Sequence, residues 1–390
     1  MVKSELKILH TESHRQWGGQ ERRIYNESRW MSMQGHRIVI VAPNATPLFE
    51  KARQEGWERY ALSFNKFGMV QDTVHLRGIL RNVRPDVLNT HGNTDSKVGL
   101  FAAWGLNIPC VIRTRHSTPP VSRSWYNRLL YGKLCHFVFT TADCVSRQIR
   151  DDLGVPEDRI RTLPSGIDPP DQMIDRDEAR RNLAEEIGVE EDRRFVGFIG
   201  RLTREKGLHV LIDAFTGIMK QVPGHHLVII GDGDPMDELR RLIHRRNAEN
   251  RIHLMGYRDD PWPYFRALDC FVLASSQFEG VPQAMLQAMF AGSPVIGTQV
   301  GGIPDIVEHG QTGLLVPPED TDRLAEAILL TLTHPESALT RAEKAYRYVS
   351  NNHTLAAMGG KIARLYEIHL SGARHPAHQS DDPQSVTRSR

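Results

Sequence analysis

The chain has few cysteines and no long apolar segment. Its 390 residues include four cysteines, at positions 110, 135, 144 and 270, and no two of them form a C-x-x-C pair. This spacing argues against a disulfide-stapled secreted protein and against a structural zinc site. No apolar run reaches the roughly 18 residues of a membrane span, and no basic-then-apolar leader opens the chain. We therefore expect a protein of the cytoplasm.

The chain also has little excess of one charge over the other, because its formal net charge is only +2. The two halves differ, however: residues 1–170 carry 24 Lys and Arg against 16 Asp and Glu, whereas the remaining residues carry 25 against 31. A basic first half favours an anionic partner, such as a phospholipid surface or a lipid-linked phosphate. Scattered, solvated charges would give the same count, so both interpretations stay open. Nucleic acid is not an expected partner.

Alternating strand and helix patterns run through most of the chain. Apolar runs typical of buried strands lead into helical patterns over short connections, which predicts an α/β protein with two Rossmann-like parallel sheets. We expect a linker over Pro169, Pro170 and the polar residues up to Glu178. We therefore predict a first domain over 1–168, a second over 169–350, a closing helix over 351–370 and a disordered tail over 371–390.

One stretch, residues 275–302, organises the second domain. Its sequence is SSQFEGVPQAMLQAMFAGSPVIGTQVGG, and it follows the apolar run 270–273. Pro282 suits the first turn of a helix, and Gly292 with Pro294 supplies the stop signals. Strand, loop, helix and strand in this order form a βαβ unit, whose ligands bind beyond the carboxyl ends of the strands. Glu279, in the loop before the helix, is therefore placed to meet a ligand.

This stretch resembles the donor-site signature of the retaining family-4 glycosyltransferases, which have the GT-B fold of two Rossmann-like domains facing each other across a cleft. The family carries two glutamates eight positions apart, the first near the transferred sugar and the second on the nucleotide ribose. Here the first is Glu279, but the second position is Gln287. An amide can still bind ribose hydroxyls but holds no charge. Gly280, Val281 and Pro282 of the same motif are implied substrate contacts.

A second motif lies at residues 200–207, GRLTREKG, just before a helical pattern at 208–221. It delivers Arg201 and Lys206 beside a helix N-terminus, an arrangement suited to a diphosphate. In the resembling family G-R-L-x-x-x-K-G holds the donor diphosphate. A solvated charged turn is the alternative interpretation.

Two further loops of the second domain carry candidate nucleotide contacts. Gly231 and Gly233 belong to a G-D-G-D loop after a predicted strand, but the third glycine of a dinucleotide fingerprint is missing, which argues against an NAD enzyme. The resemblance implies that this loop borders the nucleotide and that backbone groups at Gly256 and Tyr257 face the base.

The first domain contributes a glycine pair and two histidines. Gly18 and Gly19 precede a helical pattern, where backbone N–H groups can approach an anion, and they match the family's G-G-x-E segment at the phosphates or acceptor. His116 lies in a T-R-H-S context that resembles the family's active-site histidine, which contacts the donor sugar. His91 also follows a strand, with a structural role as the alternative.

The basic and aromatic segment 122–135 either rests on a membrane or buries its apolar side chains.

The resemblance implies a retaining glycosyltransferase with His116, Arg201, Lys206 and Glu279 in catalysis. The donor would be a nucleotide diphosphate sugar, UDP-linked, and the acceptor a glycan or lipid-linked molecule of bacterial polysaccharide or lipopolysaccharide synthesis, with peripheral contact to an anionic membrane. No cofactor and no metal are expected, since no D-x-D stands in a suitable loop.

Two alternatives remain from the sequence. A glycoside hydrolase would need two carboxyl groups about 5 to 10 Å apart, whereas one of the two motif positions is an amide. A non-catalytic nucleotide-sugar-binding protein or partner subunit is prompted by Gln287.

Overall fold

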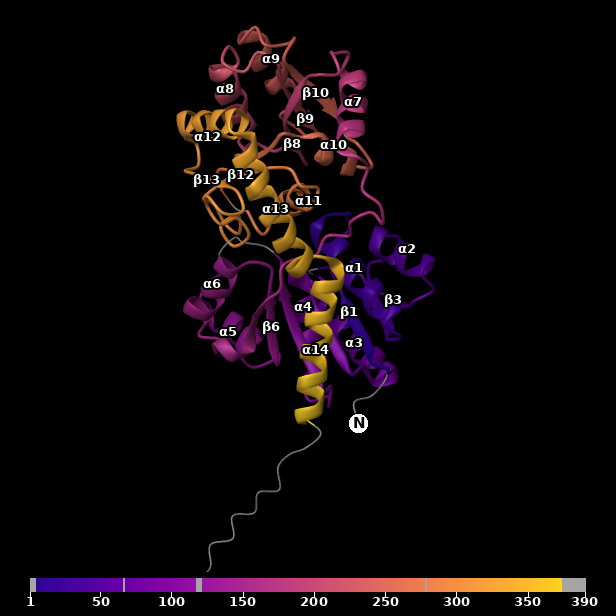
Figure 1. The fold of residues 1–390 in the computed structure, drawn as a ribbon. Coiled ribbons are helices and arrows are strands. Elements are labelled where there is room, and N and C mark those ends of the chain that lie inside the picture. Colours follow the sequence, from indigo (N-terminus) through magenta and orange to yellow (C-terminus); the bar gives the residue numbers. More distant parts are fainter. Residues whose placement is uncertain (1–4, 66, 117–120, 278, 374–390) are drawn as a thin grey trace, which may run out of the picture.

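The computed structural model describes residues 5–65, 67–116, 121–277 and 279–373, and it contains two parallel sheets (Figure 1). The first sheet has seven strands in the order β3-β2-β1-β4-β5-β6-β7, and the second has six in the order β10-β9-β8-β11-β12-β13. All strand pairs in both sheets are parallel. The predicted α/β architecture with two Rossmann-like domains is confirmed.

The first domain is built on the seven-stranded sheet. Its strands are β1 (Lys7–Thr11), β2 (Arg37–Ala42), β3 (Glu58–Ala61), β4 (Val87–Thr90), β5 (Cys110–Arg115), β6 (Phe137–Thr140) and β7 (Ile160–Thr162). Its helices are α1 (Gly19–Met33), α2 (Pro47–Gln54), α3 (Met69–Val83), α4 (Asn93–Ala103), α5 (Trp125–Gly132) and α6 (Asp143–Leu153).

The second domain is built on the six-stranded sheet. Its strands are β8 (Arg194–Ile199), β9 (His225–Ile230), β10 (Ile252–Gly256), β11 (Cys270–Leu273), β12 (Val295–Thr298) and β13 (Leu314–Val316). Its helices are α7 (Arg176–Ile187), α8 (Leu208–Ile218), α9 (Met236–Arg245), α10 (Trp262–Ala267), α11 (Gln283–Phe290), α12 (Thr321–Thr333) and α13 (Pro335–Asn352).

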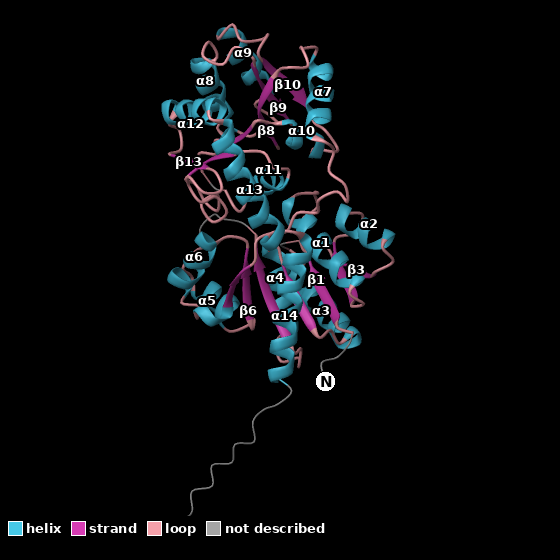
Figure 2. Ribbon diagram, viewed as in Figure 1, coloured by secondary structure: helices cyan, strands magenta, loops and turns pink. Residues whose placement is uncertain are grey.

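The central strands are buried along nearly their whole length because helices cover both faces of each sheet (Figure 2). In β11 every residue is buried, and in β8 every residue after Arg194 is buried. Crossover helices joining parallel strands bring all carboxyl strand ends to one edge of each sheet. The loops at that edge carry most of the candidate residues.

The last helix, α14 (Leu355–Ala373), returns to the first domain and runs along α1 (Figure 1). Tyr366 is buried there, and its hydroxyl donates to Glu27 Oε1 of α1 at 3.4 Å. At the crossing, Ile167 N donates to His353 O at 2.8 Å, and Leu355 N donates to Ile167 O at 2.7 Å. These bonds fasten the end of the chain to the segment that joins the domains.

Three predicted boundaries differ from the structure. The predicted linker ends earlier, since α7 begins at Arg176, where Asp175 caps the helix by accepting from the N–H groups of Asp177 and Glu178. The closing helix begins at Leu355 rather than at 351, because α13 continues to Asn352. Residues 371–373 of the predicted tail belong to α14, and 374–390 lie outside the described residues. Every helix in the described part of the chain is too short or too polar to cross a bilayer.

Candidate active site

The contact between Lys206 and Glu279 joins two loops at the carboxyl edge of the second sheet. Lys206 follows β8 and Glu279 follows β11, the strand that pairs with β8. Lys206 Nζ lies 2.5 Å from Glu279 Oε1 and 2.8 Å from Oε2. The Glu279 side chain is 10% exposed and that of Lys206 24%, so a cation and a carboxylate meet in a partly dehydrated place where their attraction is strong.

Gly207 allows these two loops to approach each other. Its φ is +64°, and a Cβ there would lie 2.0 Å from the carbonyl oxygen of Ala274. Two residues away in each loop, Ser276 N donates to Glu205 O at 2.8 Å. Only glycine accommodates both the left-handed backbone and the close carbonyl, which explains the glycine at the end of the motif.

The glycine loop after β9 packs against the backbone that carries Arg201. A Cβ on Gly231 would lie 1.8 Å from the carbonyl oxygen of Gly200, and one on Gly233 would lie 1.9 Å from that of Leu202. Leu202 N donates to Asp232 O at 2.9 Å. Arg201 is exposed between these contacts and has no ion pair within the described segments, which leaves its guanidinium available to an anion.

The remaining candidates of the second domain lie in the loop after β10 and on α11. Gly256 O accepts from Gly231 N at 2.8 Å, and the Tyr257 side chain is 64% exposed. Pro282 is buried at the N-cap of α11. Gln287 is half-buried on the same helix, and its amide has no hydrogen-bond partner in the regions that the structure describes.

The start of α11 also touches the first domain. Gln283 Nε2 donates to Ser165 O at 3.0 Å, and Val281 packs against the hydrophobic cores of both domains. Gly280 lies beside Thr141, because a Cβ on it would be 3.9 Å from Thr141 Oγ1. The motif 279–283 therefore lies where the carboxyl edges of the two sheets meet.

His116 lies at the carboxyl edge of the first sheet, just after β5. Its Nε2 lies 2.9 Å from Nδ1 of His91, and Nε2 of His91 lies 2.9 Å from Nδ1 of His10. Burial lowers the pKa of His116 and His91 well below the ordinary value. His91, weighed from sequence against a structural role, thus lies against His116. His10 was missed, because a histidine within an apolar strand gives no signal of its own.

The glycine pair lies at the start of α1, with Gly18 as its N-cap. Gly18 N already donates to Glu21 Oε2 at 2.8 Å, so of the pair the exposed Gly19 is the more available to a ligand. Glu21 Oε1 also lies 3.1 Å from His14 Nδ1, a contact that raises the pKa of His14 to about 8.

Glu12, beside these residues, is a second feature that the sequence did not indicate. It is buried and accepts from the N–H groups of Ser13 and His14 at 2.7 and 2.8 Å. Burial, with the nearby Asp95 carboxylate, raises the pKa of Glu12 to about 7. Potential ligand atoms of Glu12, His14 and Glu21 lie within 4.8 Å of one another and could hold a metal ion, although all three already form the hydrogen bonds that shape this loop.

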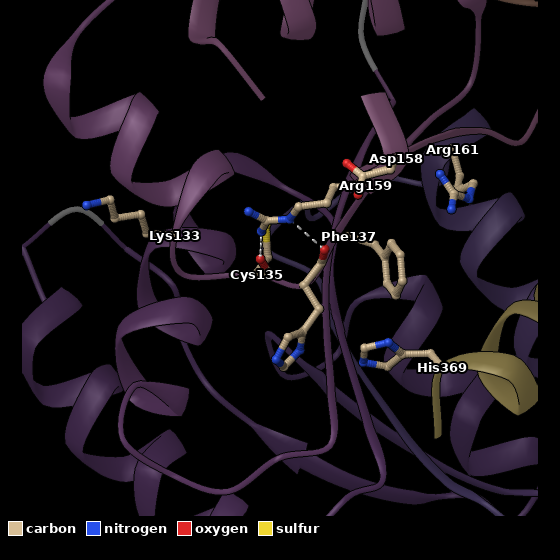
Figure 3. A pocket seen from close by; sticks show the side chains of 8 residues that line it. Lys133, Cys135, Phe137, Asp158, Arg159, Arg161 and His369 are labelled. Atoms are coloured by element: carbon tan, nitrogen blue, oxygen red, sulfur yellow. Dashed lines mark hydrogen bonds between the residues drawn. The ribbon is translucent and has the colours of Figure 1, made fainter. Parts of the chain in front are cut away.

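A cavity of about 620 Å³ lies elsewhere, at the amino end of β6 (Figure 3). Its basic side chains include Arg159, which donates to the carbonyl oxygens of His136 and Gly132 at 3.0 and 2.6 Å. His369 of α14 closes one side, with its Nε2 3.1 Å from Pro109 O. None of the predicted site residues lines this cavity.

Sequence profiles of two families match the chain. The profile described as "Glycosyl transferases group 1" matches residues 179–348, and that described as "Glycosyltransferase Family 4" matches residues 17–170. Together the two regions take up most of the chain, one in each domain.

Three relatives illustrate the similarity. The alpha-D-kanosaminyltransferase of Streptomyces kanamyceticus is 29% identical over 64% of this chain and 64% of its own length. The GDP-mannose-dependent alpha-(1-6)-phosphatidylinositol monomannoside mannosyltransferase of Mycobacterium tuberculosis is 30% identical over 63% of this chain and 64% of its own length. The chain thus spans less than two thirds of these two relatives. The UDP-Gal:alpha-D-GlcNAc-diphosphoundecaprenol alpha-1,3-galactosyltransferase of Escherichia coli is 23% identical over 93% of this chain and 97% of its own length.

Solved structures share the fold over nearly the whole chain. A glycosyltransferase from Rickettsia africae superimposes with a TM-score of 0.84 at 20% identity, covering 94% of this chain and 99% of that one. HepE of Anabaena, solved in complex with UDP, gives 0.79 at 20% identity, covering 92% and 99%. With matching profiles in both domains and this two-domain fold, the chain belongs to the family-4 glycosyltransferases of the GT-B fold.

Proposed function

We propose that this protein transfers a sugar, with retention of anomeric configuration, from a UDP sugar to a hydroxyl of a glycan or lipid-linked acceptor in bacterial cell-surface polysaccharide or lipopolysaccharide synthesis. The observation that carries the proposal is the Lys206–Glu279 contact, in which side chains 73 residues apart meet beside the glycine loops. The names of the Escherichia coli relative and of the Anabaena complex support UDP. The GDP-mannose-dependent relative makes guanine the base to test against it.

The reaction breaks the bond between the anomeric carbon and the diphosphate oxygen and forms one to the acceptor oxygen. A phosphate oxygen takes the acceptor proton, so attack occurs on the face that the diphosphate leaves. Arg201 and Lys206 stabilise the negative charge that builds on the leaving diphosphate, as preorganised charges do in catalysis. Glu279 stabilises positive charge at the anomeric carbon, and His116 binds the sugar. No step in this scheme requires a metal ion.

Ligand-dependent stability tests the donor part of the proposal. Thermal unfolding is measured with uridine, guanosine and adenosine diphosphates and their sugars. A ligand at about 100 times its dissociation constant stabilises the fold by roughly 2.7 kcal/mol, which is readily measured. Stabilisation by uridine ligands alone is expected, whereas selection of another base overturns the UDP assignment.

Transfer is then measured with the selected donor and lipid-linked glycan acceptors, and the anomeric configuration of the product is read by NMR. An α-linked product from an α-linked donor is expected, and inversion contradicts the mechanism. Gln287, an amide without a described partner, favours a second candidate, a nucleotide-sugar-binding protein without turnover. Donor binding with neither transfer nor hydrolysis would support that candidate.

A further inference from the structure

Three histidines from three neighbouring strands form one continuous row. His10 belongs to β1, while His91 and His116 directly follow β4 and β5, and β1, β4 and β5 are adjacent in the sheet. The rings are stacked, with centroids 5.2 Å apart from His10 to His91 and 5.1 Å apart from His91 to His116. In the strand register His10 pairs with Asn89 and Thr90 with Arg113. The row thus advances by two residues at each strand, which keeps all three side chains on one face.

The rings are joined by hydrogen bonds. The central ring, His91, uses its Nε2 toward His10 and its Nδ1 toward His116. His10 Nδ1 lies 2.9 Å from His91 Nε2, and His91 Nδ1 lies 2.9 Å from His116 Nε2. Burial keeps all three rings neutral by lowering the pKa of each, that of His10 to about 3. A neutral imidazole carries one N–H. Both hydrogen bonds can therefore form only if the three rings carry their protons on the same nitrogen, either all on Nδ1 or all on Nε2.

The buried end of the row favours one direction. Nε2 of His10 is buried without a hydrogen-bond partner in the described part of the protein, and so are Nε and Nη2 of Arg23. The Arg23 charge acts on His10 and contributes to its lowered pKa. An N–H on His10 Nε2 would add a further unpaired donor beside the Arg23 charge, whereas that positive charge favours a lone pair on Nε2. His10 therefore carries its proton on Nδ1 and donates to His91.

The proton position on His10 fixes those on the other two rings. His91 accepts on Nε2, so its own proton is on Nδ1 and is donated to Nε2 of His116. His116 must carry its proton on Nδ1. That nitrogen has no hydrogen-bond partner within the described segments, and the half-buried His116 lies at the carboxyl edge of the sheet.

We propose that His10 and His91 are positioning residues that hold His116 as the Nδ1–H tautomer, so that His116 offers a hydrogen-bond donor to an oxygen of the donor sugar. The sugar contact rests on the proposed function, whereas the tautomer does not. The sugar oxygen that meets His116 must act as an acceptor, and a hydroxyl at that position must direct its own proton elsewhere.

The tautomer is tested first, on the full chain labelled with ¹⁵N-histidine and without ligand. Long-range ¹H–¹⁵N correlation spectra distinguish Nδ1–H, Nε2–H and imidazolium rings, and the His116 signals among the 18 histidines are assigned from their loss in His116→Asn. We expect His116, His91 and His10 all to be Nδ1–H near pH 7. A protonated Nε2 on His116, or an imidazolium in the row, overturns the proposal.

Kinetics then test the positioning role. His10→Leu removes the first donor of the row, so the tautomer of His91 and then of His116 is no longer held; we expect kcat to fall about tenfold, the worth of one hydrogen bond made in the transition state. His10→Asn keeps an N–H near the Nδ1 position, and we expect it to restore most of the rate and the Nδ1–H signal of His116. Equal rates for the two variants, whether both high or both low, contradict the positioning role.

The second domain offers a matched control. His226 Nδ1 lies 3.0 Å from His253 Nε2, and their rings are stacked with centroids 5.2 Å apart. This pair lies on β9 and β10, near the amino end of β9. His226→Leu thus breaks a similar histidine contact away from the candidate site, and we expect kcat to stay within about twofold of wild type. If the wild-type chain transfers no sugar at all, the proposed function fails while the spectra still decide the tautomer.

Discussion

Lys206 Nζ contacts both carboxylate oxygens of Glu279, at 2.5 and 2.8 Å, and thereby joins the loop after β8 to the loop after β11. The lysine proposed to bind the donor diphosphate and the glutamate proposed to face the donor sugar are thus ion-paired with each other. A diphosphate bound to Lys206 would share this ammonium group with Glu279.

Removing the Lys206 ammonium should weaken donor binding. Lys206→Ala is expected to lower the affinity for the selected nucleoside diphosphate by roughly 1.5 to 3 kcal/mol, the worth of a charged hydrogen bond, as measured by titration calorimetry. Lys344→Ala is the control, since that lysine is exposed and donates to Gln311 Oε1 at 2.7 Å. An affinity unchanged in Lys206→Ala would remove this residue from the diphosphate site.

The Gln287 position should accept a carboxylate. Gln287→Glu is expected to leave the unfolding temperature nearly unchanged and to preserve or improve donor affinity, because this half-buried amide has no hydrogen bond to lose within the described residues. Gln283→Glu, on the same helix, is the matched comparison. It replaces the donor to Ser165 O with an acceptor and should cost about 1 to 3 kcal/mol of stability. Should Gln287→Glu destabilise the fold as much, position 287 is a packing position.

The close approach of the two loops should depend on Gly207. Gly207→Ala and Gly188→Ala both place a Cβ on a left-handed residue, with φ of +64° and +73°, but a Cβ at Gly188 meets nothing within 4 Å. Backbone strain alone should lower the free energy of unfolding by about 1 kcal/mol in Gly188→Ala. Gly207→Ala should lose about 1 to 3 kcal/mol more, from the clash with Ala274 O, and should lose donor binding. Equal denaturation midpoints for the two variants would mean that the loops can move apart without loss of stability.

The neutral His10 should make the protein less stable in acid. Its pKa is lowered to about 3 by burial and by Arg23, so between the ordinary value of 6.5 and about 3 the unfolded chain binds a proton that the folded chain does not. The free energy of unfolding therefore decreases as the pH falls below 6.5, by about 1.4 kcal/mol per pH unit from this residue.

The contribution of His10 is isolated by comparing variants. His10→Asn should flatten the fall in the free energy of unfolding between about pH 6 and pH 5 by that amount, whereas Asn in place of the exposed His75 should not. The groups acting on the histidine row, Arg23 and Arg113, remain in both variants. Glu12, with its pKa raised to about 7, stabilises the fold toward acid in both alike. A slope unchanged in His10→Asn would mean that His10 is protonated in the fold.

Local pattern predicted most of the elements, because apolar runs and helical spacing report burial directly. The helix after Lys206 begins at Leu208 as its periodicity indicates, and Glu279 lies between β11 and α11 as the β-α-β pattern predicts. The first turn of α7, up to Glu178, was predicted as linker because the buried face of this helix is limited to Ala179, Leu183 and Ala184. The capping run Asp175-Arg-Asp-Glu would have indicated its start.

The sequence by itself determined the family, the parallel α/β architecture and the loops that carry Arg201, Lys206, Glu279 and His116, since motif and periodicity are local properties of the chain. Only the tertiary structure decided which of these residues meet. Strand order differs from chain order, so β1, β4 and β5 become neighbours and align His10 with His91 and His116. In the same way β8 pairs with β11, which brings Lys206 to Glu279 across 73 residues. Contacts between distant loops follow from how the sheets assemble, and no local pattern encodes that order.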